Sequence, residues 1–60
     1  MATYHKDQRV HVNKDDMEWG RVASDGTVLE VLTKSLLVSV DSIRAAIWVQ
    51  KKDTYPLDNE

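Results

Sequence analysis

The stretch covering residues 36–49 constrains the fold most, because it holds the densest apolar run in the sequence. Its first part alternates residue by residue, with Leu36, Val38 and Val40 separated by Leu37 and Ser39. A period of two with β-branched side chains is typical of a half-buried strand. We therefore predict a strand over residues 36–40.

The second part of this stretch has two interpretations. Asp41 and Ser42 can accept hydrogen bonds from nearby backbone N–H groups, which favours either a turn or a helix start. A strand over residues 45–49 would place Ile47 and Val49 on one face and Trp48 on the other. A helix capped by Asp41 would instead group residues 43, 46, 47 and 50. The β-branched residues and Trp48 favour the strand, and the helix stays open as the alternative.

Three earlier segments also have the composition of strands. Residues 8–13 alternate with Val10 and Val12 facing inward, residues 18–23 contain Gly20 at a bend or bulge, and residues 28–32 form a third segment. Between them, residues 14–17 are predicted to form a charged loop. The Asp25-Gly26 pair between two β-prone runs predicts a hairpin, and residues 33–35 predict a second tight turn.

The length of 60 residues allows one domain over residues 1–60. Its 42% apolar and 30% charged residues are those of an ordinary globular chain. We expect the folded part over residues 7–50, a polar lead-in over residues 1–6, and a solvated C-terminal tail over residues 51–60.

Charge and composition restrict the setting. The net charge of −2 argues against broad electrostatic capture of nucleic acid, which needs a basic stripe. No apolar run approaches the roughly 18 residues of a transmembrane helix, and there is no cysteine for a disulfide or a thiolate ligand. We expect a cytoplasmic protein that does not enter a membrane.

The sequence offers no constellation for catalysis or metal binding. On an extended chain His5 and His11 would lie about 20 Å apart, so we expect two solvated histidines. The acidic residues 15, 16 and 18 are predicted to form a solvated turn, and no nucleophile elbow or phosphate-binding glycine loop occurs. We predict no catalytic residue, no metal, no cofactor and no enzyme activity.

The two tryptophans are the most informative side chains for binding. Trp19 and Trp48 both fall outside the inward phase of their predicted strands, and tryptophan is enriched at binding hot spots. With Arg9, Arg21 and Tyr55 they form our predicted partner-binding set. The alternative is that the tryptophans complete the core or are covered by residues 55–57.

This order of short strands and turns resembles the small SH3-like barrel, an all-β fold of five strands. In that fold the last two strands are commonly joined by a 3₁₀ turn, which residues 41–44 would supply. The opening DQRVHV resembles the D-x-V-x-V start of KOW-type and other SH3-like barrels. The resemblance covers residues 7–50. The alternative fold is α+β, a β-meander followed by a C-terminal helix from Asp41.

Two functions are consistent with this resemblance. The first is a non-catalytic protein-interaction module that docks on a larger protein and regulates it, as small phage or plasmid accessory proteins with such folds often do. The second is a KOW-like accessory protein that binds nucleic acid through basic residues 9, 21, 34 and 44. Self-association into a homo-oligomer is compatible with both.

Overall fold

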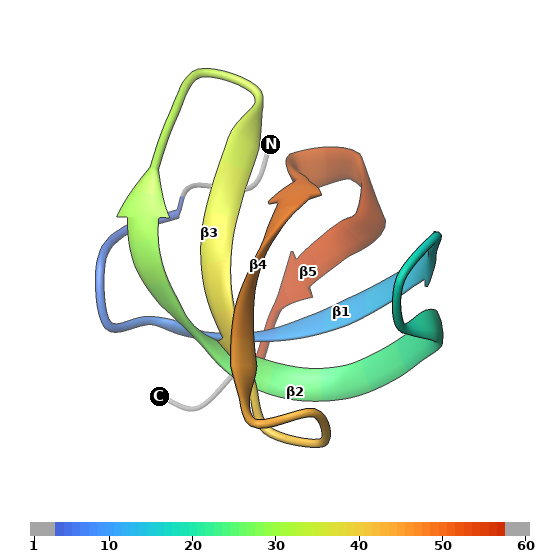
Figure 1. Ribbon diagram of the computed structural model, residues 1–60. Coiled ribbons are helices and arrows are strands. Elements are labelled where there is room, and N and C mark those ends of the chain that lie inside the picture. The colour runs from blue at the N-terminus through green and yellow to red at the C-terminus, as the bar shows by residue number, and fades with distance from the viewer. Residues whose placement is uncertain (1–3, 58–60) are drawn as a thin grey trace.

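The computed structural model describes residues 4–57, which form five antiparallel strands and one 3₁₀ helix (Figure 1). The elements are β1 (Arg9–Asp16), β2 (Gly20–Val31), β3 (Ser35–Val40), β4 (Ala45–Gln50), η1 (Lys51–Asp53) and β5 (Thr54–Pro56). The strands pair in the order β4-β3-β2-β1-β5. The predicted mainly β fold is confirmed. The alternative helix after Asp41 is wrong, because residues 45–50 form β4.

The long strand β2 gives the sheet its shape. Its first part pairs with β1, from Gly20 opposite Asp16 to Thr27 opposite Arg9, and its last part pairs with β3. Figure 1 shows β2 running in one continuous curve from the β1–β2 hairpin to the β2–β3 hairpin. Within residues 4–57 no strand pairing joins β4 to β5, so the sheet is curved around its core without closing through backbone hydrogen bonds.

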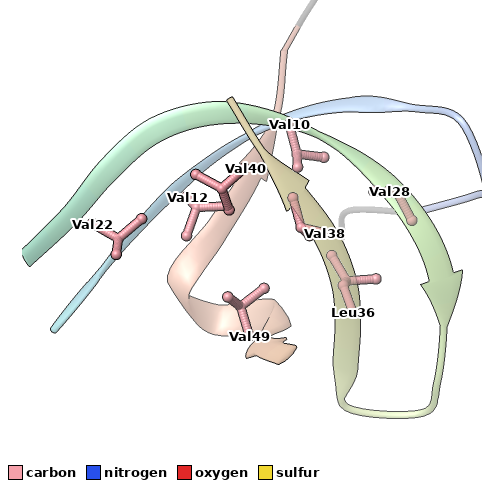
Figure 2. Packing of buried hydrophobic residues seen from close by; sticks show 8 residues of the cluster. All are labelled: Val10, Val12, Val22, Val28, Leu36, Val38, Val40 and Val49. Atoms are coloured by element: carbon pink, nitrogen blue, oxygen red, sulfur yellow. The ribbon is translucent and has the colours of Figure 1, made fainter. Parts of the chain in front are cut away.

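The core is built almost entirely from valine. Figure 2 shows eight side chains meeting on the inner side of the curved sheet, all 2% exposed or less: Val10, Val12, Val22, Val28, Leu36, Val38, Val40 and Val49. They occupy alternate positions along each strand, because successive side chains of a strand point to opposite faces. The predicted inward phase of residues 10 and 12 is therefore confirmed, and residues 36, 38 and 40 of the predicted half-buried strand face the same core.

The predicted hairpin at Asp25-Gly26 is wrong, because both residues lie inside β2. Gly26 is needed for close packing of backbones and not for a positive φ angle. A Cβ atom there would lie 2.6 Å from the carbonyl oxygen of Ser39 and 2.6 Å from Cγ1 of Val38. Gly26 pairs with Val10 on one side and Val40 on the other, so it sits where β2 passes from one partner to the next.

The first hairpin turn instead follows Asp16. β1 runs on through most of the predicted charged loop, and residues 17–19 form the turn. The Asp16 carboxylate accepts backbone N–H hydrogen bonds from Glu18 at 2.7 Å and Trp19 at 3.0 Å, and Gly20 follows with a φ of 74°. Asp and Gly thus do mark a hairpin, but four positions apart.

The segment expected to be a solvated tail belongs to the sheet. Residues 51–53 form η1, and β5 pairs with β1 so that Tyr55 lies opposite His11 and Thr54 opposite Val12. The expected tail is wrong for residues 51–56, and residues 58–60 lie outside the described part. Five strands are present because residues 18–32 contribute one strand fewer than predicted and residues 54–56 contribute one more.

The lead-in is also more structured than expected. Tyr4 packs against the core, and its hydroxyl donates a hydrogen bond to the Thr54 carbonyl oxygen at 3.1 Å. The Asp7 N–H donates to the Val28 carbonyl at 2.7 Å. A loose lead-in is therefore wrong from residue 4 onward, while residues 1–3 lie outside the described part.

The two remaining turns lie close to their predicted places, although the turn predicted over residues 33–35 covers residues 32–34 and Ser35 already belongs to β3. Residues 32–34 connect β2 to β3, and the Leu32 N–H donates to the Ser35 carbonyl at 2.9 Å. Residues 41–44 form a turn in which Arg44 has a φ of 54°. That turn is not the expected 3₁₀ element, which instead lies at Lys51–Asp53, directly before the last strand.

Candidate interaction surface

The five predicted partner-binding residues are distributed over different parts of the molecule. Arg9 lies opposite Thr27 and Arg21 opposite Asp15, at the two ends of the β1–β2 pairing. Six residues of ladder separate these two rows, which is about 20 Å. The structure therefore does not place both arginines in one patch.

Both arginines are engaged by carboxylates. Arg9 donates hydrogen bonds to Asp41 Oδ2 at 2.7 Å and to Thr27 Oγ1 at 2.8 Å. The hydrogen bond to Asp41 raises the pKa of Arg9, and the same bond lowers the pKa of Asp41. Arg21 donates to Asp15 Oδ1 at 3.0 Å. These pairs reduce the positive charge that either arginine offers to a partner.

Tyr55 lies on β5 with a neighbour that the sequence did not indicate. Its ring stacks on the His11 imidazole, with ring centroids 5.2 Å apart, and Tyr55 stays 56% exposed. His11 Nδ1 lies 2.9 Å from Asp25 Oδ1. The expectation of a solvated His11 is wrong, because its ring is half-buried and contacts Tyr55 on β5 and Asp25 on β2, the two strands next to β1.

The two tryptophans are both exposed, Trp19 by 42% and Trp48 by 51%. Their backbones are linked by a short polar path. The Lys14 ammonium donates to the Trp48 carbonyl oxygen at 3.4 Å and lies 3.5 Å from Asp16 Oδ2. Backbone hydrogen bonds from Glu18 and then Trp19 lower the pKa of the Asp16 carboxyl, and Lys14 lowers it further. One lysine therefore connects the strand of Trp48 to the turn of Trp19.

Trp48 lies on the outer face of the β3–β4 pair. Strand register places it beside Leu37, and the next outward-facing row pairs Ala46 with Ser39. Leu37 is half-buried and Ala46 is exposed. We call these four residues, Leu37, Ser39, Ala46 and Trp48, the Trp48 face. Residues 55–57, which the alternative prediction placed over the tryptophans, instead run along β1 near the opposite edge of the sheet.

A basic hollow adjoins the Trp48 face at the β2–β3 turn. It has a volume of about 540 Å³ and is lined by six residues, which we call the lysine hollow: Thr33, Lys34, Ser35, Gln50, Lys51 and Lys52. Ser35 and Gln50 are opposite each other in the β3–β4 register, one outward row beyond Leu37 and Trp48. The exposed side chains of Val31 and Leu32 lie at the same turn, and both line a second hollow that shares Thr33, Lys34 and Ser35.

Sequence reasoning missed the lysine hollow because it joins a predicted turn to a predicted tail. The contact that brings them together is a backbone hydrogen bond from the Lys51 N–H to the Lys34 carbonyl at 3.0 Å. The only local signal was the Lys51-Lys52 pair directly after an apolar strand.

Residues 4–57 contain neither a cluster of metal ligands nor a membrane-spanning helix. Among residues 4–57, no group of three or more His, Asp or Glu side chains is arranged to hold a metal ion. Within the same residues, no helix has the length and apolar character to span a membrane.

Comparison with known proteins gives no relative. No protein-family model matches the chain, and neither a curated protein nor a solved structure matches it.

Proposed function

We propose that this chain is a small non-catalytic interaction module of the SH3-like barrel type, which docks on a larger protein through the Trp48 face and regulates it. The observation that carries the proposal is the position of Trp48. It is 51% exposed beside Leu37, on strands whose inner faces already hold the core. Tryptophan is one of the side chains in which binding hot spots are enriched, and here it is exposed next to an aliphatic side chain.

The SH3-like part of the proposal is supported by the arrangement of the last two strands. A 3₁₀ element, Lys51–Asp53, joins β4 to β5, and this is the connection expected of that fold. The strong curvature of β2, with the core enclosed on its inner side, is compatible with a small barrel.

Docking by the face of the sheet is better supported than docking by the edge of β4. The Lys14 ammonium already donates to the Trp48 carbonyl on that edge strand. A partner strand that paired with β4 at this point would have to displace Lys14. The outer side chains of β3 and β4 need no such displacement.

The test is an affinity capture with three forms of the tagged chain: wild type, Trp48→Ala and Trp19→Ala. Each lysate is divided and run with and without nuclease. We expect a protein that wild type and Trp19→Ala retain after nuclease and that Trp48→Ala loses. Equal retention by all three forms, after the captured protein has been purified and shown to bind directly, would contradict docking through the Trp48 face.

A second candidate function is binding of single-stranded nucleic acid. The lysine hollow beside Trp48 favours it, since such sites combine positive charge with an aromatic side chain on which bases stack. Three lysine–phosphate contacts would give a slope of about −2 for the logarithm of affinity against the logarithm of salt concentration. Binding without that slope, or no binding at low salt, would contradict this candidate.

A cytoplasmic location, a phage or plasmid origin and self-association stay predictions from the sequence. Light scattering of the purified chain measures self-association directly, and a dimer whose formation Trp48→Ala abolishes would identify a second copy as the occupant of the Trp48 face.

A further inference from the structure

The basic side chains divide into those that form an ion pair with a carboxylate and those that do not. Of the eight Lys and Arg residues, three are paired with carboxylates: Arg9 with Asp41, Lys14 with Asp16, and Arg21 with Asp15. The other five make no ion pair within residues 4–57: Lys6, Lys34, Arg44, Lys51 and Lys52. Three of these five line the lysine hollow, and none of the carboxylates of residues 4–57 lines it. Positive charge is thus concentrated at one place on a chain whose net charge is −2.

The backbone holds these lysines close together. The Lys51 N–H donates to the Lys34 carbonyl, and the Leu32 N–H donates to the Ser35 carbonyl across the turn. The Lys51 carbonyl in turn accepts from Thr54 Oγ1 at 3.0 Å, and Thr54 is buried. Because the main chain is fixed on both sides, the ammonium groups are able to separate only by side-chain rotation.

An anion in the hollow would relieve the repulsion among these three charges. Hydroxyl groups of Thr33 and Ser35 and the amide of Gln50 line the same space and are able to donate hydrogen bonds to oxygen. Lysine and neutral donors around an open hollow suit an oxyanion such as a carboxylate.

The hollow and the Trp48 face form one continuous surface. Gln50 follows Trp48 by two residues on the same side of β4, a separation of about 7 Å. An extended peptide has the same two-residue spacing between side chains on one face. One residue of such a peptide is therefore able to reach the hollow while the next but one rests on Trp48 and Leu37.

We infer that the partner presents an extended acidic segment, with a carboxylate in the lysine hollow and an apolar side chain on Trp48. This inference rests on the proposed docking function and names the chemistry of the partner. A protein segment fits better than nucleic acid because Glu30 lies opposite Leu37, in the same outer row as Trp48. A backbone with a phosphate at every nucleotide would be repelled there, whereas a peptide carries acidic charge only where it meets lysine.

The test is a titration followed by the amide and indole NMR signals of the ¹⁵N-labelled full chain. The probes are a short peptide of glutamate, leucine and serine, its counterpart with glutamine in place of glutamate, and a single-stranded oligothymidylate. We expect the acidic peptide to shift the amides of Lys34, Lys51 and Lys52 together with the Trp48 indole. The glutamine peptide is expected to bind more weakly.

Two variants with equal charge change provide the control. Lys34→Gln/Lys52→Gln removes charge from the hollow, and Lys6→Gln/Arg44→Gln removes the same charge elsewhere from unpaired side chains. We expect the first to raise the dissociation constant of the acidic peptide roughly threefold to tenfold and the second by less than about twofold. Equal weakening by both would overturn the inference, because only net charge would then matter.

The signals of the lysine hollow test the acidic-segment inference, and the Trp48 indole signal tests docking on the Trp48 face. Absence of shifts at the hollow at the highest peptide concentration overturns the acidic-segment inference, whether or not the Trp48 indole responds. Shifts at the hollow without a response of Trp48 support the carboxylate site and contradict docking on the Trp48 face. Tighter binding of oligothymidylate that depends on Lys34 and Lys52 overturns the inference in favour of nucleic acid.

Discussion

The Lys14 ammonium on β1 donates a hydrogen bond to the Trp48 carbonyl oxygen on β4, at 3.4 Å. These residues are 34 positions apart, and their strands are not neighbours in the sheet. A charged side chain thus bridges two strands that no backbone ladder joins, and it places a cation at the edge of β4. Cationic side chains at sheet edges discourage uncontrolled strand pairing.

Replacing Lys14 tests whether this bridge supports the curved sheet. We expect Lys14→Met to lower the free energy of unfolding by about 1 kcal/mol, because it removes a charge-assisted hydrogen bond and a neighbour of Asp16. Urea denaturation measures the change. The exposed neighbour Asn13 provides the control, and Asn13→Ala should change stability by less than about 0.5 kcal/mol. Equal effects of the two substitutions would show that the bridge contributes nothing.

The two glycines are predicted to respond differently to substitution. Gly26→Ala should cost at least about 3 kcal/mol, because the new methyl group meets the Ser39 backbone at 2.6 Å. Gly20→Ala should cost only about 1–2 kcal/mol, since its φ of 74° is unfavourable but, apart from Gly20 and its chain neighbours, no atom of residues 4–57 lies within 4 Å of the added atom. Thermal unfolding of both variants measures the difference. A smaller loss of stability for Gly26→Ala than for Gly20→Ala would contradict close packing at Gly26 and would favour the hairpin at Asp25-Gly26.

Local patterns predicted the parts of the fold that depend on alternation. Val10, Val12, Val38 and Val40 face the core because alternate residues of a strand share one face, and these apolar residues fall on the same face of their strands. The prediction at Gly26 was wrong because a single sequence does not distinguish a glycine needed for close packing from a glycine needed for a turn. The choice between them depends on Val38 and Ser39 of β3, which lie 12 and 13 residues further along the chain.

The candidate site was predictable only in part, for the same reason. Exposure of Trp48 follows from its phase on β4, and the structure agrees. The lysine hollow depends on the contact between Lys34 and Lys51, which are distant in sequence. That contact exists because β3 and β4 pair in one register, and no local pattern encodes it.

Tyr4 is predicted to hold the N-terminal segment against the last strand. Tyr4→Phe removes the hydroxyl that donates to the Thr54 carbonyl and accepts from Thr54 Oγ1, and it should lower the free energy of unfolding by about 1 kcal/mol. Tyr55→Phe is the matched control, because the Tyr55 side chain is exposed and its contact with His11 is ring stacking. Urea denaturation of both variants decides, and a Tyr4→Phe variant as stable as wild type would contradict the role of the hydroxyl.

Stability should fall in acid through two aspartates. The pKa of Asp16 is lowered by backbone hydrogen bonds from Glu18 and Trp19, and the pKa of Asp41 is lowered by the hydrogen bond from Arg9. A lowered pKa in the folded state means that folding favours the charged carboxylate. The stabilisation is therefore present at neutral pH and is lost as the pH falls below about 4.

Urea midpoints at pH 7 and pH 3 measure this acid dependence. We expect Asp16→Asn to show a smaller loss between the two pH values than wild type, because its side chain no longer titrates. Glu30→Gln is the control, since no hydrogen bond or ion pair involves Glu30 within residues 4–57, and it should lose as much as wild type. An unchanged loss in Asp16→Asn would refute the assignment.

The affinity of the purified partner for Trp48→Ala, compared with wild type and Trp19→Ala, tests docking through the Trp48 face most directly. Circular dichroism first establishes that each variant is folded. Removing a hot-spot tryptophan typically costs about 2 kcal/mol or more, so the dissociation constant should rise about thirtyfold or more for Trp48→Ala. Trp19→Ala should change it by less than about threefold. Equal dissociation constants for Trp48→Ala and wild type would contradict the proposed function.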